Sequence, residues 1–142
     1  MAFAGLEIPP ELERILLVEG QSLARVGLAE FLRVRGYRVF DAGESLEALQ
    51  ILQSGQALDL AIVDASLLGG ADGFDLARAL RAECPDIKVI VTSDAVHSIG
   101  QPEDGLSDVR PLLKPFSRRD LLDSVREALA AQMTRAPSGD AG

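Results

Sequence analysis

The sequence predicts an α/β fold in which a five-stranded parallel sheet is covered by helices on both faces. Short apolar runs alternate along the chain with stretches whose apolar residues recur every three or four positions. Such short, mostly apolar runs are typical of strands that are buried on both faces of a sheet. Five of them separated by helical stretches favour a doubly wound sheet, and 142 residues are enough to bury the core of one domain.

The first half of the chain supplies three strands and two helices. Residues 14–18 (RILLV), 37–40 (YRVF) and 58–63 (LDLAIV) are predicted as the strands. Between the first two strands, apolar residues at helical spacing predict a helix that Gly36 ends as a left-handed cap. A second helix follows the second strand and is expected to end near Ser54.

The second half supplies two further strands and two further helices. A glycine-rich turn precedes a predicted helix at residues 74–82, and residues 87–91 (IKVIV) and 109–113 are predicted as strands. Ser117 and Asp120 have the spacing of a capping box, which opens a final helix. The apolar stripe of that helix consists of Leu121, Leu122, Val125, Ala128 and Leu129.

Composition and charge exclude several classes of protein. The formal net charge of −8 and the scattered basic residues, of which only Arg118 and Arg119 are adjacent, argue against binding to nucleic acid. Arg110, Arg118 and Arg119 are expected to be solvated, and contact with a partner is the alternative. The single cysteine, Cys84, cannot form an internal disulfide. We expect Cys84 and the lone histidine, His97, to lie in loops without a chemical role.

No segment has the pattern of a signal peptide or a membrane span. The first ten residues lack a basic start, and no apolar run reaches the roughly 18 residues that a membrane helix needs. We therefore expect a cytoplasmic protein that does not bind membranes. Residues 1–13 are expected to form an extension, residues 14–130 the folded domain, and residues 131–142 a flexible tail.

Polar side chains follow four of the five predicted strands. Glu19 follows the first strand, Asp64 the third, Thr92 the fourth and Lys114 the fifth. Ligands of doubly wound sheets bind beyond the carboxyl ends of the strands, so these four side chains are expected to converge there. The sequence thus predicts a site with two carboxylates, a hydroxyl and an amine.

These residues and their spacing resemble the receiver domains of two-component signalling, from about Arg14 to Leu129. The resemblance implies a flavodoxin-like receiver fold and a signalling module that is not an enzyme. The positions that match the family pattern are Glu19, Arg25, Gly36, Glu47-Ala48-Leu49, Asp59-Leu60, Asp64, Asp72-Gly73, Thr92 and Lys114-Pro115-Phe116.

The resemblance also implies a role for each site residue. Asp64 would be the phosphoacceptor, the nucleophile that attacks a partner's phosphohistidine. Lys114 would supply positive charge to the phosphoryl oxygens and Thr92 a hydrogen bond. Glu19, Asp64 and the backbone carbonyl of Ser66 would bind a Mg²⁺ ion.

Partners follow from the same resemblance. A histidine kinase or a phosphotransfer protein would donate the phosphoryl group, and a downstream protein would respond to it. The sequence ends soon after its last predicted helix, so we expect a receiver without an attached output domain, as a monomer or weak dimer.

The sequence departs from the family pattern at the metal site. Receivers usually carry two adjacent acids after the first strand, and here Glu19 is followed by Gly20. A hard divalent cation prefers anionic oxygen ligands, so the loss of one carboxylate predicts weak or absent Mg²⁺ binding.

Three further departures point to an atypical subtype. The loop between Asp64 and Gly73 is one residue longer than usual and lacks the usual proline. Pro111 occupies the place of an aromatic side chain that changes rotamer in many receivers. Residues 100–105 (GQPEDG) make a regular fourth helix improbable, so that helix is expected to be short or replaced by a loop.

Three functions therefore compete. The first is a receiver that is phosphorylated on Asp64, and the second is a degenerate receiver that binds partners without phosphorylation because of Gly20. The third is a small flavodoxin-like binder of a nucleotide or flavin, with Gly20 in a phosphate loop, although a lone glycine matches the known phosphate-binding motifs poorly.

Overall fold

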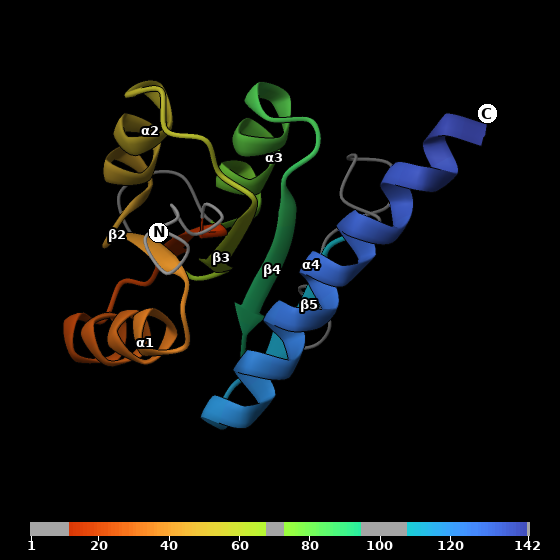
Figure 1. Ribbon diagram of the computed structural model, residues 1–142. Helices are drawn as coiled ribbons and strands as arrows, with labels where there is room; N and C mark the ends of the chain where they lie inside the picture. The colour runs from red at the N-terminus through yellow and green to blue at the C-terminus, as the bar shows by residue number, and fades with distance from the viewer. Residues whose placement is uncertain (1–11, 68–72, 95–107, 142) are drawn as a thin grey trace, which may run out of the picture.

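The computed structural model describes residues 12–67, 73–94 and 108–141 and contains the predicted parallel sheet (Figure 1). All strand pairs are parallel, and the strand order is β2-β1-β3-β4-β5. This arrangement confirms the doubly wound fold. The strands are β1 (Arg14–Val18), β2 (Arg38–Ala42), β3 (Leu60–Asp64), β4 (Lys88–Ser93) and β5 (Arg110–Leu113).

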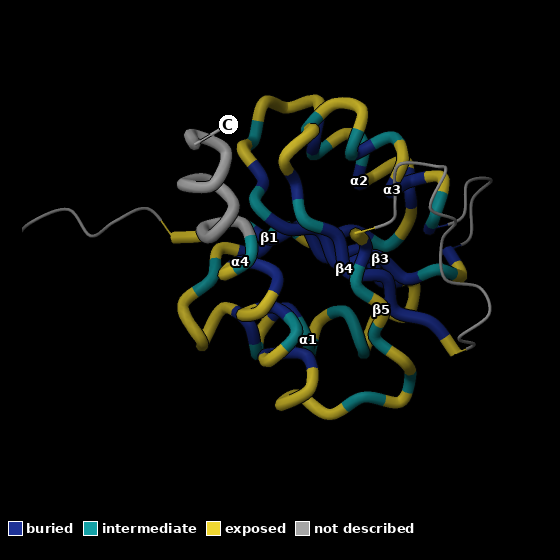
Figure 2. The backbone as a smooth tube through the Cα atoms, turned by 90° about the vertical axis from the view of Figure 1, so that its right-hand side faces the viewer, coloured by how far each residue is buried: buried dark blue, intermediate teal, exposed yellow. Residues whose placement is uncertain are grey.

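Two pairs of helices cover the two faces of the sheet (Figure 2). The helices of the described residues are α1 (Ser22–Val34), α2 (Ser45–Gln53), α3 (Gly73–Glu83) and α4 (Arg118–Ala141). Helices α2 and α3 pack with one hydrophobic cluster that includes the fully buried Leu16 and Leu80. Helices α1 and α4 pack with a second cluster that includes Leu32 and Leu121. Burial of apolar surface on both faces explains why the central strands β1, β3 and β4 consist mostly of apolar residues.

The strand ends differ slightly from the prediction. Strand β2 continues to Ala42, two residues beyond the predicted end, because Asp41 and Ala42 pair with Leu17 and Val18 of β1. Hydrogen bonding to a neighbouring strand thus extends β2 beyond the point where its apolar pattern ends.

Two expectations about helices can be compared with the structure. The described residues contain four helices, and this number agrees with the expectation that the family's fourth helix is short or replaced by a loop. Residues 95–107, which include the place of that helix and His97, lie outside the described residues. Helix α4 continues through residues 131–141, where the sequence predicts a tail, since a nucleated helix extends at little cost. The division into extension, domain and tail stays a prediction.

Local signals in the sequence explain several helix ends. Gly36 has a φ angle of +101°, which confirms the left-handed cap after α1. At the start of α4, the Asp120 N–H donates to Ser117 Oγ at 3.0 Å and the Ser117 N–H donates to Asp120 Oδ2 at 3.2 Å. These two bonds form the predicted capping box. In the part of the chain described, no helix is both long and apolar enough to cross a bilayer.

Candidate functional site

The four predicted site residues lie together at the carboxyl edge of the sheet. Asp64 ends β3 and pairs in register with Thr92 of β4, so their side chains are neighbours on adjacent strands. The Lys114 N–H donates to the Ser93 carbonyl at 2.9 Å, which extends the ladder by one bond past β5. Parallel strands bring their carboxyl ends to one edge, and this geometry joins residues that are far apart in sequence.

Asp64 is a buried carboxylate with two fixed donors. It is 7% exposed, and its Oδ1 accepts a hydrogen bond from the Ser66 N–H at 2.9 Å. Its Oδ2 lies 3.2 Å from Lys114 Nζ. The bond from Ser66 closes a tight turn after β3, which sets the direction of the carboxylate.

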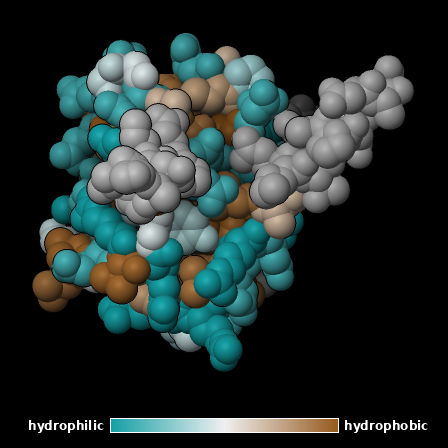
Figure 3. All heavy atoms as spheres, viewed as in Figure 1, coloured by the Kyte–Doolittle hydropathy of each residue, from teal (hydrophilic) through white to brown (hydrophobic). Residues whose placement is uncertain are grey.

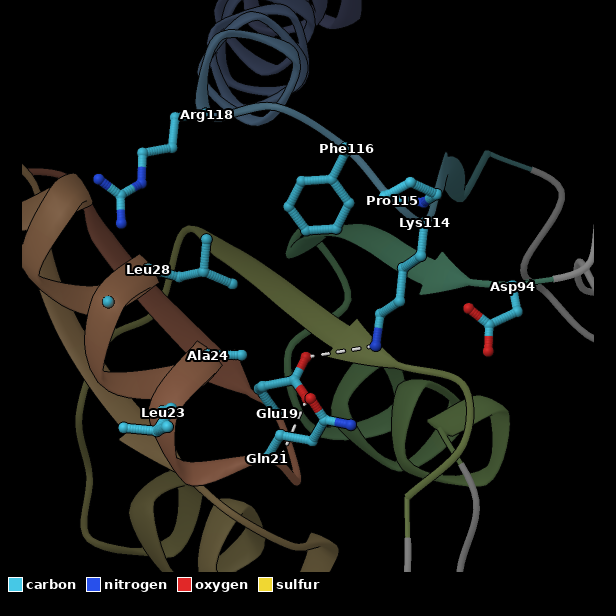
Figure 4. A pocket seen from close by; sticks show the side chains of 11 residues that line it. Glu19, Gln21, Leu23, Ala24, Leu28, Asp94, Lys114, Pro115, Phe116 and Arg118 are labelled. Atoms are coloured by element: carbon cyan, nitrogen blue, oxygen red, sulfur yellow. Dashed lines mark hydrogen bonds and ion pairs between the residues drawn. The ribbon is translucent and has the colours of Figure 1, made fainter.

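Glu19 is the second buried carboxylate of the site. It is 4% exposed, its Oε2 accepts from the Gln21 N–H at 3.0 Å, and its Oε1 lies 3.5 Å from Lys114 Nζ. Its backbone is also held, because Arg25 Nη1 donates to the Glu19 carbonyl at 2.8 Å. The two acids are therefore bridged by a single ammonium group, as Figure 4 shows for the side of Glu19.

The two carboxylates change the acidity of Lys114. Partial burial by itself would lower the pKa of this lysine, but the charges of Asp64 and Glu19 and the hydrogen bonds to them outweigh that effect. The net result is a pKa raised above the ordinary lysine value of 10.5. Lys114 is therefore a permanent positive charge at neutral pH, placed beside the proposed nucleophile.

Thr92 is almost fully buried at the end of β4. Its carbonyl accepts a hydrogen bond from the Ala65 N–H at 2.9 Å, which ties the turn after Asp64 to the neighbouring strand. Thr92 is thus the residue next to Asp64 on the neighbouring strand, and the ladder determines its position. A β-branched residue in this place also suits the strand itself.

Comparison with known proteins agrees with this geometry. The family model described as "Response regulator receiver domain" matches residues 15–126. The response regulator receiver protein CpdR of Brucella abortus is 33% identical over 123 residues, which cover 84% of this chain and 99% of that protein. A crystal structure of a response regulator receiver protein from Sinorhizobium medicae has a TM-score of 0.78 at 26% identity, covering 86% and 98% of the two chains.

The chain belongs to the response regulator receiver family. The sensor kinase CckA of Brucella abortus is 36% identical over 126 residues, and the chain spans only 13% of the length of that relative. Membership favours a receiver over the nucleotide or flavin binder that Gly20 raised as an alternative.

The receiver has fewer anionic donors for a metal ion than its family pattern implies. Two carboxylates, Glu19 and Asp64, face the site, and both lie near the ammonium of Lys114. Within the described ranges no group of three or more Asp, Glu, His or Cys side chains is placed to hold a metal ion. Two carboxylates and one carbonyl suit a weakly bound divalent cation in their chemistry, and Glu19, Asp64 and the carbonyl of Ser66 stay predictions as its ligands.

The position of Gly20 has room for the absent acid. Gly20 is exposed, and a Cβ atom added there would meet only the Gly43 carbonyl oxygen, at 3.8 Å. Nothing in the backbone around β1 therefore requires a glycine. The missing carboxylate is a chemical difference from the family pattern and not a steric necessity of this fold.

A pocket of about 470 Å³ adjoins the site between α1 and the segment after β5 (Figure 4). Glu19 and Lys114 line its polar end, and Leu28 and Phe116 line its apolar end. Asp94 also lines it and was not among the predicted site residues. It follows the observed end of β4 at Ser93, but Thr92 and Ser93 separate it from the apolar run at residues 87–91, so the apolar pattern did not indicate it.

Proposed function

We propose that this receiver accepts a phosphoryl group on Asp64 from a phosphohistidine of a partner protein. An oxygen of the Asp64 carboxylate would form a bond to phosphorus as the bond between phosphorus and the histidine nitrogen breaks. The histidine leaves with the bonding electron pair and takes up a proton as neutral imidazole. The observation that carries the proposal is the buried Asp64 carboxylate, 3.2 Å from the ammonium of Lys114.

Each neighbour of Asp64 would contribute to this transfer. Lys114 would offset the negative charge of the incoming phosphoryl oxygens, and its raised pKa keeps it charged at neutral pH. Thr92 would donate a hydrogen bond to one of those oxygens. Glu19, Asp64 and the Ser66 carbonyl would hold Mg²⁺, which when bound supplies further positive charge to the phosphoryl group.

The second candidate is a receiver that acts without phosphorylation, and Gly20 favours it. With one carboxylate fewer, the site attracts Mg²⁺ less strongly than the family pattern implies. The site would then hold the Lys114 bridge permanently, and partner proteins would recognise a single state of the surface.

A phosphodonor experiment separates the two candidates. The protein is incubated with acetyl phosphate over a range of Mg²⁺ concentrations, and intact mass spectrometry measures an adduct of about 80 Da, the mass of one phosphoryl group. Phosphorylation on Asp64 predicts an adduct that Asp64→Asn abolishes. The matched control is Asp94→Asn, which removes an exposed carboxylate from the same pocket and should retain the adduct. No adduct at any Mg²⁺ concentration would refute the proposal in favour of the second candidate.

Helix α1 supplies the surface on which we expect the donor protein to dock. Leu23 is 90% exposed and Val26 is 57% exposed, and Leu23 lines the pocket beside Lys114. Apolar side chains this exposed, next to the reacting group, suit a protein partner. One curated relative is named Sporulation initiation phosphotransferase F and is 29% identical over 118 residues, which agrees with a role in phosphoryl transfer between proteins.

Docking and chemistry can be tested separately. Leu23→Asp is expected to slow transfer from a phosphorylated histidine kinase or phosphotransfer protein by at least about tenfold while leaving acetyl phosphate labelling unchanged. Leu46→Asp on α2, where Leu46 is 63% exposed, is the matched control and should leave both rates unchanged. Equal effects of the two variants would contradict docking on α1.

A further inference from the structure

A basic groove lies between the second half of α1 and the first turns of α4. Its volume is about 340 Å³, and four arginines line it: Arg35, Arg118, Arg119 and Arg126. Phe31 of α1 supplies apolar lining to the groove, and Asp123 also lines it. The lining of the groove is therefore net positive, although the net charge of the chain is −8.

The four groove arginines differ from five other arginines of the described residues. Those five pair with carboxylates: Arg25 and Arg33 with Asp41, Arg78 with Asp75, Arg81 with Asp108, and Arg110 with Glu127. Across the described ranges, the groove arginines have no carboxylate within ion-pair distance, Asp123 included. Their charges are therefore available to an external anion.

Contacts within the protein account for the positions of only two of these four arginine side chains. The guanidinium groups of Arg35 and Arg118 lie 5.2 and 5.6 Å from the centre of the Phe31 ring, so cation–π contacts hold these two side chains at the groove. Arg119 has no such contact in the described structure, and it lies in the first turn of α4, where the helix dipole disfavours a positive charge. Arg126 lies two turns further along the same face.

Apolar surface continues from this groove along α1. A neighbouring hollow is lined by Gly27, Glu30, Phe31, Val34 and Arg118, and Val34 is 77% exposed. Figure 3 shows exposed apolar side chains in the region of α1, beside the hydrophilic surface of the start of α4. Basic and apolar side chains therefore occur together on this surface, with Glu30 and Asp123 among them, and a small inorganic anion would contact only the basic ones.

We propose that this groove binds an acidic, amphipathic segment of a partner protein. Carboxylates of that segment would pair with Arg119 and Arg126, because the planar guanidinium group binds a carboxylate with two parallel hydrogen bonds. Apolar side chains of the segment would contact Phe31 and Val34. The net charge of −8 disfavours a densely charged polyanion such as DNA, whose phosphates the rest of the surface would repel.

The groove lies apart from the strand-end site, so the proposal does not depend on phosphorylation of Asp64. Of the four arginines, only Arg118 also lines the pocket beside Lys114. A variant that lacks Arg119 and Arg126 should therefore be labelled by acetyl phosphate as the unaltered protein is. This comparison distinguishes a failure of the groove proposal from a failure of the phosphorylation proposal.

The test is an NMR titration of the ¹⁵N-labelled full chain with a synthetic helical peptide that carries glutamates and leucines on one face. We expect saturable shifts confined to the amides of α1 from Phe31 onward and the first turns of α4. A peptide with glutamine in place of glutamate is the ligand control, and inorganic phosphate and a short DNA duplex are the competing ligands.

Matched variants assign the binding to the groove. Arg119→Gln/Arg126→Gln should weaken the peptide by about tenfold, whereas Arg38→Gln/Arg78→Gln, which removes the same charge elsewhere, should change its affinity by less than about twofold. Circular dichroism and thermal denaturation check that both variants fold. Equal binding of the glutamine peptide, equal effects of the two variants, or stronger saturation of the groove by phosphate or DNA would each overturn the proposal.

Discussion

Replacing Gly20 by aspartate is expected to strengthen Mg²⁺ binding at the strand edge. The substitution adds a third carboxylate beside Glu19 and Asp64, the two acids already present. It should be well tolerated, because Gly20 has no positive φ angle and its added Cβ would meet only the Gly43 oxygen, at 3.8 Å. The change thus tests the charge of the site without disturbing the backbone that holds it.

The expected gain follows from the exposure of position 20. Mg²⁺ carries two charges, so one carboxylate about 4 Å away attracts it by about 2 kcal/mol in bulk water and by about 8 kcal/mol at an effective dielectric constant of 20. Gly20 is exposed whereas Glu19 and Asp64 are buried, so the value near that for bulk water, about 2 kcal/mol, is appropriate. At 1.4 kcal/mol per factor of ten, this free energy corresponds to a decrease of about 30-fold in the dissociation constant of Mg²⁺.

Isothermal titration calorimetry is the suitable assay, because the chain contains no tryptophan to report binding by fluorescence. Gly20→Asn is the control: it has nearly the shape of aspartate without the charge, and it should gain far less. Mg²⁺ affinity that is unchanged in Gly20→Asp, or that rises equally in Gly20→Asn, would refute the explanation that a carboxylate is missing.

Two further predictions concern stability. Gly73→Ala should lower the free energy of unfolding by about 1–3 kcal/mol, because its Cβ would overlap the Asp64 carbonyl oxygen and lie 2.7 Å from Ala65 Cα. Urea denaturation measures this loss, and Gly20→Ala, made where space is open, should be nearly neutral. Lys114→Met should cost about 1–2 kcal/mol near neutral pH, because two buried carboxylates lose their shared ammonium. Since the pKa of Lys114 is raised above 10.5, its contribution is complete below that pH and disappears as pH rises through the raised value. Thermal denaturation at about pH 8 and about pH 11 should therefore show a difference between wild type and Lys114→Met that shrinks in alkali, and a constant difference would contradict the assigned ion pairs.

The order of the elements could be predicted because their signals are local. Short, mostly apolar runs identified all five strands, and Gly36 and the pair Ser117 and Asp120 identified helix ends that the structure confirms. The exact strand ends could not be predicted in the same way. Strand β2 extends to Ala42 because β1 supplies its hydrogen-bond partners, and those partners belong to a distant part of the chain.

The candidate site could be predicted in its chemistry but not in its contacts. Glu19, Asp64, Thr92 and Lys114 were found because each follows an apolar run. Asp94 was missed because Thr92 and Ser93 separate it from the apolar run at residues 87–91. Their roles in phosphoryl transfer stay predictions. The ion pairs of Lys114 with Asp64 and Glu19 could not be predicted from the sequence, since Lys114 is 50 residues from Asp64 and 95 residues from Glu19.

The sequence by itself thus determined which side chains stand at the ends of the strands, because alternation of apolar and polar residues is a property of neighbouring positions. Only the tertiary structure decided that one ammonium lies between two buried carboxylates, because the distance between them depends on the strand order β2-β1-β3-β4-β5. The tertiary structure also decided that Arg35, which follows α1, lines the same groove as Arg119 and Arg126 of α4. Contacts of this kind arise from the packing of elements, which no local pattern specifies.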